Sequence, residues 1–175
     1  IKEVRKGLLK TTPEVSDKDI FNYYNSSEYL SHNKGSSLFS LAYSLASKFM
    51  LKRKLNLIDK YIDSSKRFLD FGCGVGNLVL EMKSKGFESC GVENNSKALS
   101  ECDKKNINVH RDLSSVKSQL DLVTCWHSIE HLLDYKSTLF QLNRLIVNNG
   151  YLIIAVPNHD SFDSKYYGKY WAGYD

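Results

Sequence analysis

The sequence lacks several patterns that would assign it to a familiar class at once. No stretch of the chain approaches the ~18 consecutive apolar residues that a membrane-spanning helix requires, and its first ten residues, IKEVRKGLLK, lack the apolar core of a secretory signal. The four cysteines show no CxxC spacing, which argues against disulfides and against a cysteine metal site. We therefore expect a cytoplasmic protein without a membrane span.

The overall composition is that of an ordinary globular domain. The chain has 175 residues, of which 42% are apolar and 25% charged, so it is long enough for a single sizeable core and is not disordered. The net charge of +4 is concentrated in the first half of the chain. Lys52, Arg53 and Lys54 belong to this basic half, but no interleaved aromatic stripe accompanies them. We expect them to form the solvated face of a helix and do not expect a nucleic acid partner.

A change of pattern divides the chain near residue 37. The first 36 residues are polar, with an aromatic cluster of Phe21, Tyr23, Tyr24 and Tyr29. From residue 38 apolar residues recur every three or four positions, which predicts a helix over 38–62 with an apolar face that packs on a sheet. Ser36 or Ser37 is the expected N-cap. We assign 1–64 to an N-terminal helical cap or substrate segment and 65–175 to the main domain.

From residue 66 onward, predicted strands and helices alternate. The expected strands are 66–72, 89–93, 107–110, 121–126 and 151–157, and the expected helices between them are 77–85, 96–105 and 135–147. This alternation predicts an α/β fold with a doubly wound parallel sheet. In such sheets ligands bind beyond the carboxyl ends of the strands.

The first of these strands ends in a glycine loop, LDFGCGVGNL. Gly72, Gly74 and Gly76 allow a tight turn and a close approach of the backbone to a ligand. A dinucleotide fingerprint would need glycine at the position of Asn77, and Asp70 would repel a pyrophosphate. The loop therefore favours a cationic or zwitterionic ligand.

These residues resemble the class I S-adenosylmethionine-dependent methyltransferases, which have a Rossmann-like fold. The resemblance is carried by LDFGCGVG and by an acidic residue after each of the next two strands, and it covers roughly 20–175. It implies that Asp70 and the loop hold the methionine part of the cofactor, that Glu93 accepts hydrogen bonds from the ribose hydroxyls, and that Asp112 meets the adenine amino group. The predicted cofactor-binding residues are Asp70, Gly72, Cys73, Gly74, Gly76, Asn77, Glu93, Asn94, Asp112, Leu113, Trp126 and His127. The product would be S-adenosylhomocysteine.

The string HSIEH at 127–131 has two interpretations. It matches the inverted zinc-peptidase pattern, H-x-x-E-H, but that site needs a long helix and a further ligand, and no glutamate follows Glu130. It also resembles the methyltransferase loop after the fourth strand. There His131 is the first candidate for a general base, with His127 second and Glu130 beside them; the alternative is that His131 only caps or packs the following helix. Some related quinone-type O-methyltransferases use a divalent metal near this loop, but two ligands are too few, and we predict no metal.

The last segment, VPNHDSFDSKYYGKYWAGYD, is rich in aromatic residues. Similar segments cover the acceptor site in bacterial small-molecule methyltransferases, so we expect either an apolar lid over a planar acceptor or ordinary packing on the N-terminal tyrosines. The family adds two antiparallel strands beyond this point, and we expect a sheet truncated after its fifth strand. The predicted activity is methyl transfer to oxygen or nitrogen of a small molecule. The alternatives are an RNA or protein methyltransferase, against which the absence of an NPPY-like tetrapeptide counts, and a non-catalytic cofactor-binding module. A homodimer is compatible with this interpretation.

Overall fold

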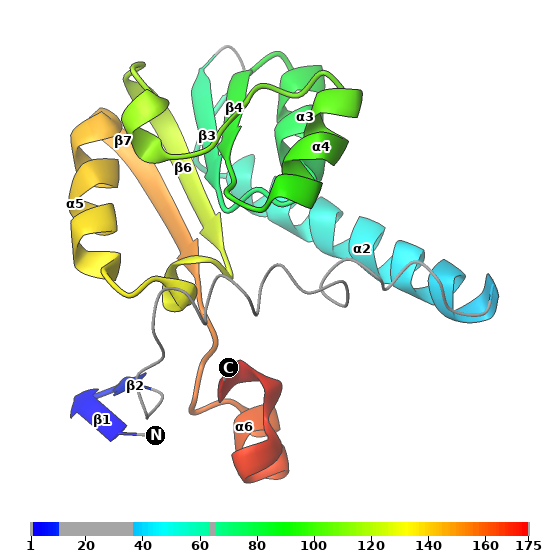
Figure 1. Cartoon of the computed structure of the whole chain (residues 1–175), viewed down its shortest axis with the longest axis vertical. Coiled ribbons are helices and arrows are strands. Elements are labelled where there is room, and N and C mark those ends of the chain that lie inside the picture. The colour runs from blue at the N-terminus through cyan, green and yellow to red at the C-terminus, as the bar shows by residue number, and fades with distance from the viewer. Residues whose placement is uncertain (1, 11–36, 64–65, 175) are drawn as a thin grey trace.

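A computed structural model describes residues 2–10, 37–63 and 66–174, and its centre is a five-stranded parallel sheet. The strand order is β5-β4-β3-β6-β7. The strands are β3 (Arg67–Phe71), β4 (Glu88–Val92), β5 (Val109–His110), β6 (Leu120–Trp126) and β7 (Ile146–Ala155). The helices are α2 (Ser37–Ile58), α3 (Asn77–Ser84), α4 (Ser96–Lys104), α5 (Tyr135–Leu145) and α6 (Phe162–Tyr167), with a separate hairpin of β1 (Lys2–Arg5) and β2 (Leu8–Lys10) (Figure 1). The predicted α/β fold with a doubly wound parallel sheet is confirmed.

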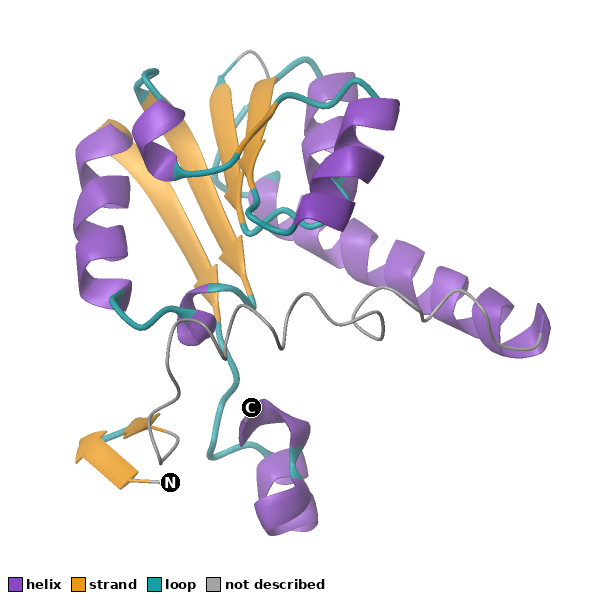
Figure 2. Cartoon of the chain, viewed as in Figure 1, coloured by secondary structure: helices purple, strands orange, loops and turns teal. Residues whose placement is uncertain are grey.

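Helices cover both faces of the sheet (Figure 2). Side chains alternate between the faces along each strand, so Phe68 of β3 and Leu122 of β6 pack with α2 and α3. Leu69 and Val123 point the other way and join the core cluster that includes Leu142 of α5. All of these side chains are fully buried. Phe68 and Asp70 of β3 therefore share one face, toward α2, with the even-numbered residues of β6 from Leu122 onward. Leu120, which lies before a bulge in the pairing of β6 with β7, packs in the opposite cluster.

The α5–β7 boundary differs from the predicted one. Helix α5 ends at Leu145, not at residue 147, and β7 begins at Ile146, not at 151. The reason is a bulge: Leu120 pairs with Ile146, and Leu122 pairs with Tyr151. The residues between these pairs include Asn149, which has a φ of 65°. Pairing with β6 thus extends β7 through the sequence Asn148-Asn149-Gly150, which is typical of a turn when considered alone.

Helix α2 packs on the sheet only through its last turns, which corrects the prediction of a continuous apolar contact face. Leu51, Leu55 and Ile58 join the core, whereas Leu41 and Phe49 are 58% and 61% exposed. A helix of 22 residues is ~33 Å long, whereas a five-residue strand spans only ~17 Å. The helix therefore runs out beyond the sheet (Figure 1). It ends at residue 58, not at 62, in a turn closed by Ile58 O.

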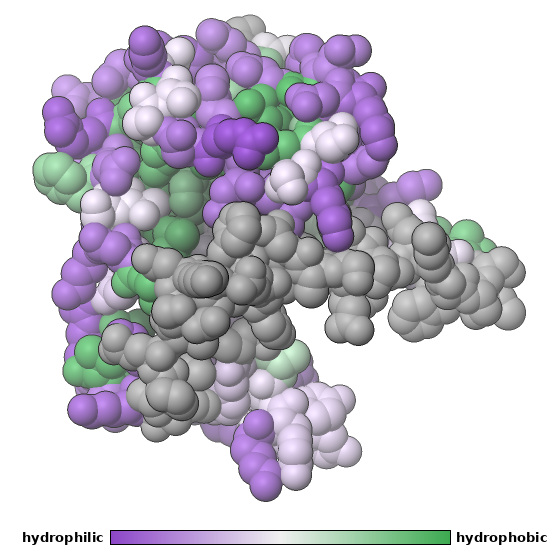
Figure 3. Space-filling model, in the orientation of Figure 1, coloured by the Kyte–Doolittle hydropathy of each residue, from purple (hydrophilic) through white to green (hydrophobic). Residues whose placement is uncertain are grey.

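The remaining N-terminal predictions fall mostly on residues that the structure does not describe. The aromatic cluster at 21–29 and the proposed Ser36 cap lie outside the described residues. The β1–β2 hairpin was not predicted from the sequence. Within the described ranges, no helix combines the length and apolarity needed to span a membrane. The view in Figure 3 shows a mostly hydrophilic surface over the sheet and its helices, with hydrophobic residues in small patches.

Candidate functional site at the carboxyl edge of the sheet

Four of the parallel strands end in segments that carry the predicted site residues. β3 leads into Asp70–Gly76, β4 into 93–95, β5 into Asp112 and β6 into 126–131. Neighbouring strands run parallel and in register, so all four segments lie at one edge of the sheet. The structure thus brings the predicted residues together.

Asp70 is the buried polar centre of this edge. Its residue is 4% exposed, and its Oδ1 accepts a 2.6 Å hydrogen bond from Thr124 Oγ1. The two residues are paired across β3 and β6. Burial raises the pKa of Asp70 to about 6 and Glu93 adds to the rise, while the Thr124 hydrogen bond and the Lys54 ammonium oppose it. Sequence reasoning missed Thr124, and only the strand register reveals it.

The glycine loop is held in place by backbone contacts. The amides of Gly72 and Cys73 both donate to Val92 O, at 2.8 and 3.1 Å. Gly72 has a φ of 72°, and a Cβ at this position would lie 2.5 Å from Ser128 Cβ. Ser128 itself donates from Oγ to Phe71 O at 3.0 Å. Glycine is therefore required at residue 72 both by backbone conformation and by close packing of the β6 loop.

The other residues of the loop have different surroundings. A Cβ on Gly74 would meet nothing within 4 Å, whereas one on Gly76 would meet Ile107 at 2.7 Å. The Cys73 side chain packs against Gly91, where a Cβ would lie 2.4 Å from its sulfur. Burial raises the pKa of the Cys73 thiol, so this thiol is not a nucleophile at neutral pH.

Glu93 connects the second strand to the glycine loop. Its Oε2 accepts from Gly74 N at 2.9 Å, and its Oε1 accepts from the amides of Asn94 and Asn95 at 2.9 and 2.8 Å. Asn95 in turn caps α4 by accepting from Lys97 N and Ala98 N. The carboxylate is thus fixed at the edge of the sheet beside the glycine loop.

Asp112 has a local role in the structure. Its Oδ1 accepts from Ser114 N at 2.9 Å and so caps a short 3₁₀ helix, Leu113–Ser115. Hydrogen bonds from Ser114 lower the pKa of Asp112. Leu113 is buried in the core. The contact of Asp112 and Leu113 with adenine remains a prediction.

The segment 127–131 forms a loop with one 3₁₀ turn, Ile129–His131. His127 has a φ of 52°, and its Nδ1 lies 3.4 Å from Glu130 Oε1. Their side chains are 63% and 19% exposed, respectively. The long helix that an inverted zinc-peptidase site needs is absent here, and in the described part of the chain no three His, Cys, Asp or Glu residues are grouped to hold a metal.

Lys54 is a site residue that sequence reasoning misplaced. It was expected on a solvated face, but its Nζ lies 4.9 Å from the centroid of the Trp126 ring, and it interacts electrostatically with Asp70. Lys52 and Arg53 are exposed. Trp126 closes β6, and its buried Nε1 has no hydrogen-bond partner among the residues that the structure describes. The helical spacing holds the signal that was overlooked: Lys54 lies three residues after Leu51 and four before Ile58, which pack on the sheet.

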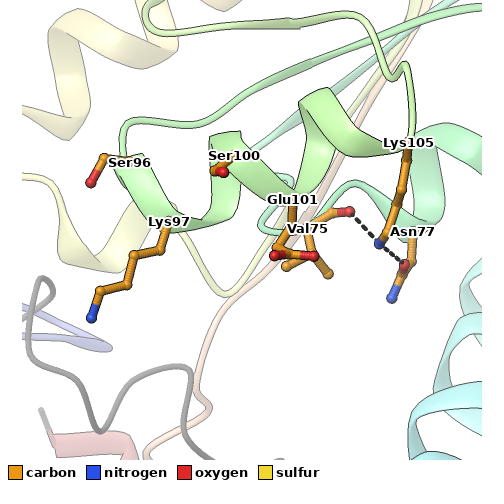
Figure 4. Close-up of a pocket in the computed structure, with 7 residues that line it drawn as sticks. All are labelled: Val75, Asn77, Ser96, Lys97, Ser100, Glu101 and Lys105. Atoms are coloured by element: carbon orange, nitrogen blue, oxygen red, sulfur yellow. Dashed lines mark hydrogen bonds between the residues drawn. The ribbon is translucent and has the colours of Figure 1, made fainter.

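A surface groove of about 760 Å³ lies beside the glycine loop, between the loop and α4 (Figure 4). Lys105 Nζ reaches across its end, 3.0 Å from Val75 O and 3.1 Å from Asn77 Oδ1. Of the predicted cofactor-binding residues, only Asn77 lines this groove. We place the candidate site at the edge around Asp70 and Glu93, because the buried carboxylate and the ordered loop amides lie there.

The C-terminal aromatic residues are mostly exposed. Phe162, Tyr166 and Tyr170 are 78%, 71% and 80% exposed, and the Phe162 and Tyr166 rings stack with centroids 5.9 Å apart. Tyr174 is anchored, since its hydroxyl lies 3.1 Å from Ser164 Oγ. The expected packing on the N-terminal tyrosines involves residues outside the described ranges.

A parallel sheet with this order, a glycine loop after β3 and carboxylates at the ends of β3 and β4 define a Rossmann-like protein of the methyltransferase type. The model of a family described as "Methyltransferase domain" matches residues 44–174, and the chain belongs to this family. The prediction of a class I methyltransferase relationship is confirmed.

Curated relatives agree with this family, and a solved structure shares the fold. The chain is 28% identical over 120 residues to a ubiquinone biosynthesis O-methyltransferase of Nitrosomonas europaea, a match covering 61% of this chain and 51% of that protein. A ubiquinone biosynthesis O-methyltransferase of Stutzerimonas stutzeri is 26% identical over 119 residues, with the same coverage. The chain thus matches about half the length of these curated relatives. The crystal structure of magnesium protoporphyrin IX methyltransferase from Synechocystis with bound SAM has the same fold, with a TM-score of 0.63, 18% identity and coverage of 85% and 80%.

Proposed function

We propose that this chain is an S-adenosylmethionine-dependent methyltransferase that acts on a small-molecule acceptor. The observation that carries the proposal is the buried Asp70 beside the glycine loop, in a chain that belongs to a methyltransferase family. The named relatives are O-methyltransferases, which favours oxygen over nitrogen as the atom that receives the methyl group.

The donor set at this edge fits the cofactor. Asp70 offers a carboxylate to the cofactor's ammonium group, and its burial strengthens any ion pair formed there. At Gly74 a Cβ would meet nothing within 4 Å, so the backbone there is open to a close ligand. Glu93 Oε1 and Oε2 are held by loop amides and are the acceptors for the ribose hydroxyls. Asp112 and the backbone of Leu113 would meet the adenine ring.

The cofactor supplies a methyl group already activated by a sulfonium, so the protein must chiefly align the acceptor and exclude water. An acceptor hydroxyl must also lose its proton. Of the two histidines proposed as general bases, the structure favours His127: Glu130 lies on its Nδ1 side, which leaves Nε2 as the basic nitrogen. His131, the first candidate from the sequence, becomes the second.

The test is calorimetric titration of the purified chain with S-adenosylhomocysteine, followed by assays of methyl transfer to phenolic and amine acceptors. We expect saturable binding near one per chain, lost in Asp70→Ala. Lys83→Ala, which removes an exposed charge from the last turn of α3, at the end of that helix away from the glycine loop, is the control and keeps wild-type affinity.

The two stages separate the alternatives. If a folded wild-type chain binds no S-adenosylhomocysteine, the proposed site is wrong. If it binds but transfers no methyl group to any small acceptor, while binding RNA or a peptide in a salt-sensitive way, the acceptor class is wrong. His127→Gln and Glu130→Gln are expected to slow turnover, and Glu130→Gln is expected to do so without weakening cofactor binding.

A further inference from the structure

Lys54 occupies an unusual position for a lysine. The side chain is partly buried, and burial lowers the pKa of its ammonium group, which Asp70 partly restores. Removing an ammonium from water is unfavourable unless a partner compensates for it. The face of the Trp126 ring, 4.9 Å away, is one such partner, and the buried carboxylate of Asp70 is the other.

The alternation of side chains in the sheet explains why these groups meet. Asp70 of β3 and Thr124 and Trp126 of β6 have the same parity and face α2, as do Phe68 and Leu122, which pack against that helix. The last turns of α2 are fixed on this face by Leu51, Leu55 and Ile58. Lys54 lies among these anchoring residues, so its ammonium is directed toward the end of the strands.

We propose that Lys54 is a positioning residue that keeps the Asp70 carboxylate ionised and so ready for a cationic ligand. The inference rests on the proposed function, since it assigns α2 a role in the cofactor site. In this role Lys54 does not contact the ligand. Its positive charge favours the ionised form of Asp70, which binds the ligand.

Several groups around Asp70 shift its pKa, and Lys54 acts against those that favour the protonated form. Glu93, at the end of β4, raises the pKa of Asp70, as does burial, while the Thr124 hydroxyl lowers it. The neighbouring thiols Cys73 and Cys125 have raised pKa values and stay neutral. Among the groups that act on Asp70, Lys54 is thus the positive charge that favours the ionised form.

The experiment measures S-adenosylhomocysteine affinity from pH 5 to pH 8.5 for wild type, Lys54→Met and Lys54→Arg. An ammonium ligand needs ionised Asp70, so binding weakens as the pH falls through the pKa of Asp70. We expect Lys54→Met to move this midpoint upward by about one pH unit, with up to tenfold weaker binding near pH 6 and wild-type affinity at pH 8.5. Lys54→Arg restores the wild-type profile. Lys52→Met, an exposed residue on the same helix, is the matched control and leaves the midpoint unchanged.

Two outcomes would contradict the inference. If Lys54→Met weakens binding by the same factor at every pH, Lys54 contacts the cofactor directly and does not act through Asp70. If the variant binds like wild type throughout, Lys54 has no role in the site.

A second readout keeps the inference separate from the proposed function. The carboxyl carbon resonance of Asp70, assigned by its loss in Asp70→Asn, can be titrated in the unliganded protein. A higher midpoint in Lys54→Met supports the inference even if no cofactor binds, whereas an unchanged midpoint overturns it even if binding is strong.

Discussion

Gly72 offers the sharpest test of how the site is packed. Alanine at this position must adopt a φ of 72°, and its Cβ would lie 2.5 Å from Ser128 Cβ. The left-handed backbone costs ~1–2 kcal/mol for a residue other than glycine, and forcing an extra methyl group into a filled space adds ~1–3 kcal/mol. Ser128 cannot easily retreat, because its Oγ is hydrogen-bonded to Phe71 O at 3.0 Å. We therefore expect Gly72→Ala to lower the free energy of unfolding by about 2–5 kcal/mol.

Gly74 is the matched control. It has a φ of 54°, but nothing lies within 4 Å of its Cβ position, so Gly74→Ala should show only the backbone cost of ~1–2 kcal/mol. Urea denaturation of both variants, with equal m-values, measures the difference.

A double-mutant cycle isolates the contact with Ser128. Ser128→Gly removes the Cβ that the new methyl group would strike, so the cost of Gly72→Ala should fall to that of Gly74→Ala when both changes are combined, a coupling of ~1–3 kcal/mol. Ser128→Ala keeps the Cβ but removes the hydrogen bond that holds it, so its rescue should be smaller than that of Ser128→Gly. Equal costs for Gly72→Ala and Gly74→Ala, or no coupling with Ser128→Gly, would refute the argument that the β6 loop packs directly on the glycine turn.

Three further predictions follow from buried or strained residues. Asp70→Asn should stabilise the unliganded chain at pH 7.5 by up to about 3 kcal/mol and abolish S-adenosylhomocysteine binding. Because the pKa of Asp70 is raised in the folded state, its contribution to stability is fully present below pH 4 and is lost as the pH rises through about 6. The urea midpoints of wild type and Asp70→Asn should therefore converge at low pH. His127→Gly relieves the φ of 52° and should raise the unfolding free energy by ~1 kcal/mol while lowering turnover ~100-fold or more; unchanged turnover would exclude His127 as the base. Phe68→Ala should cost ~3–5 kcal/mol, against ~0.5 kcal/mol or less for the exposed Phe140→Ala, both measured by denaturation.

The cofactor edge could be predicted from sequence because its geometry follows from the order of the strands. Residues that directly follow parallel strands must share one edge of the sheet, so Asp70, Glu93 and Asp112 could be grouped without coordinates. Thr124 could not be assigned to the site from sequence. Only the strand register shows that its hydroxyl lies opposite Asp70.

Helix α2 shows where the sequence pattern misleads. Apolar residues at helical spacing predicted contact along its whole length, but only a partner of sufficient length can bury such a face. The sheet ends after about two turns of contact, and Leu41 and Leu45 remain exposed among the described residues. The inward cation, in contrast, could have been chosen from the sequence, because Lys54 lies three residues after Leu51 and four before Ile58 and so sits closest to their face of the helix.

Asp70 and Lys54 together link the stability of the fold to its proposed activity. A buried carboxylate with a raised pKa destabilises the unliganded chain near neutral pH, and an asparagine would be tolerated better by the fold alone. Thr124 and Lys54 reduce this penalty without removing it. A bound cationic ligand would compensate for the rest of this destabilisation. The free energy of unfolding that Asp70 costs the unliganded chain would then be recovered, in part, when the ligand binds. A carboxylate at residue 70 is therefore best explained by a role in binding a cationic ligand. The same argument explains why α2 places Lys54 beside the Trp126 ring, where its charge acts on Asp70.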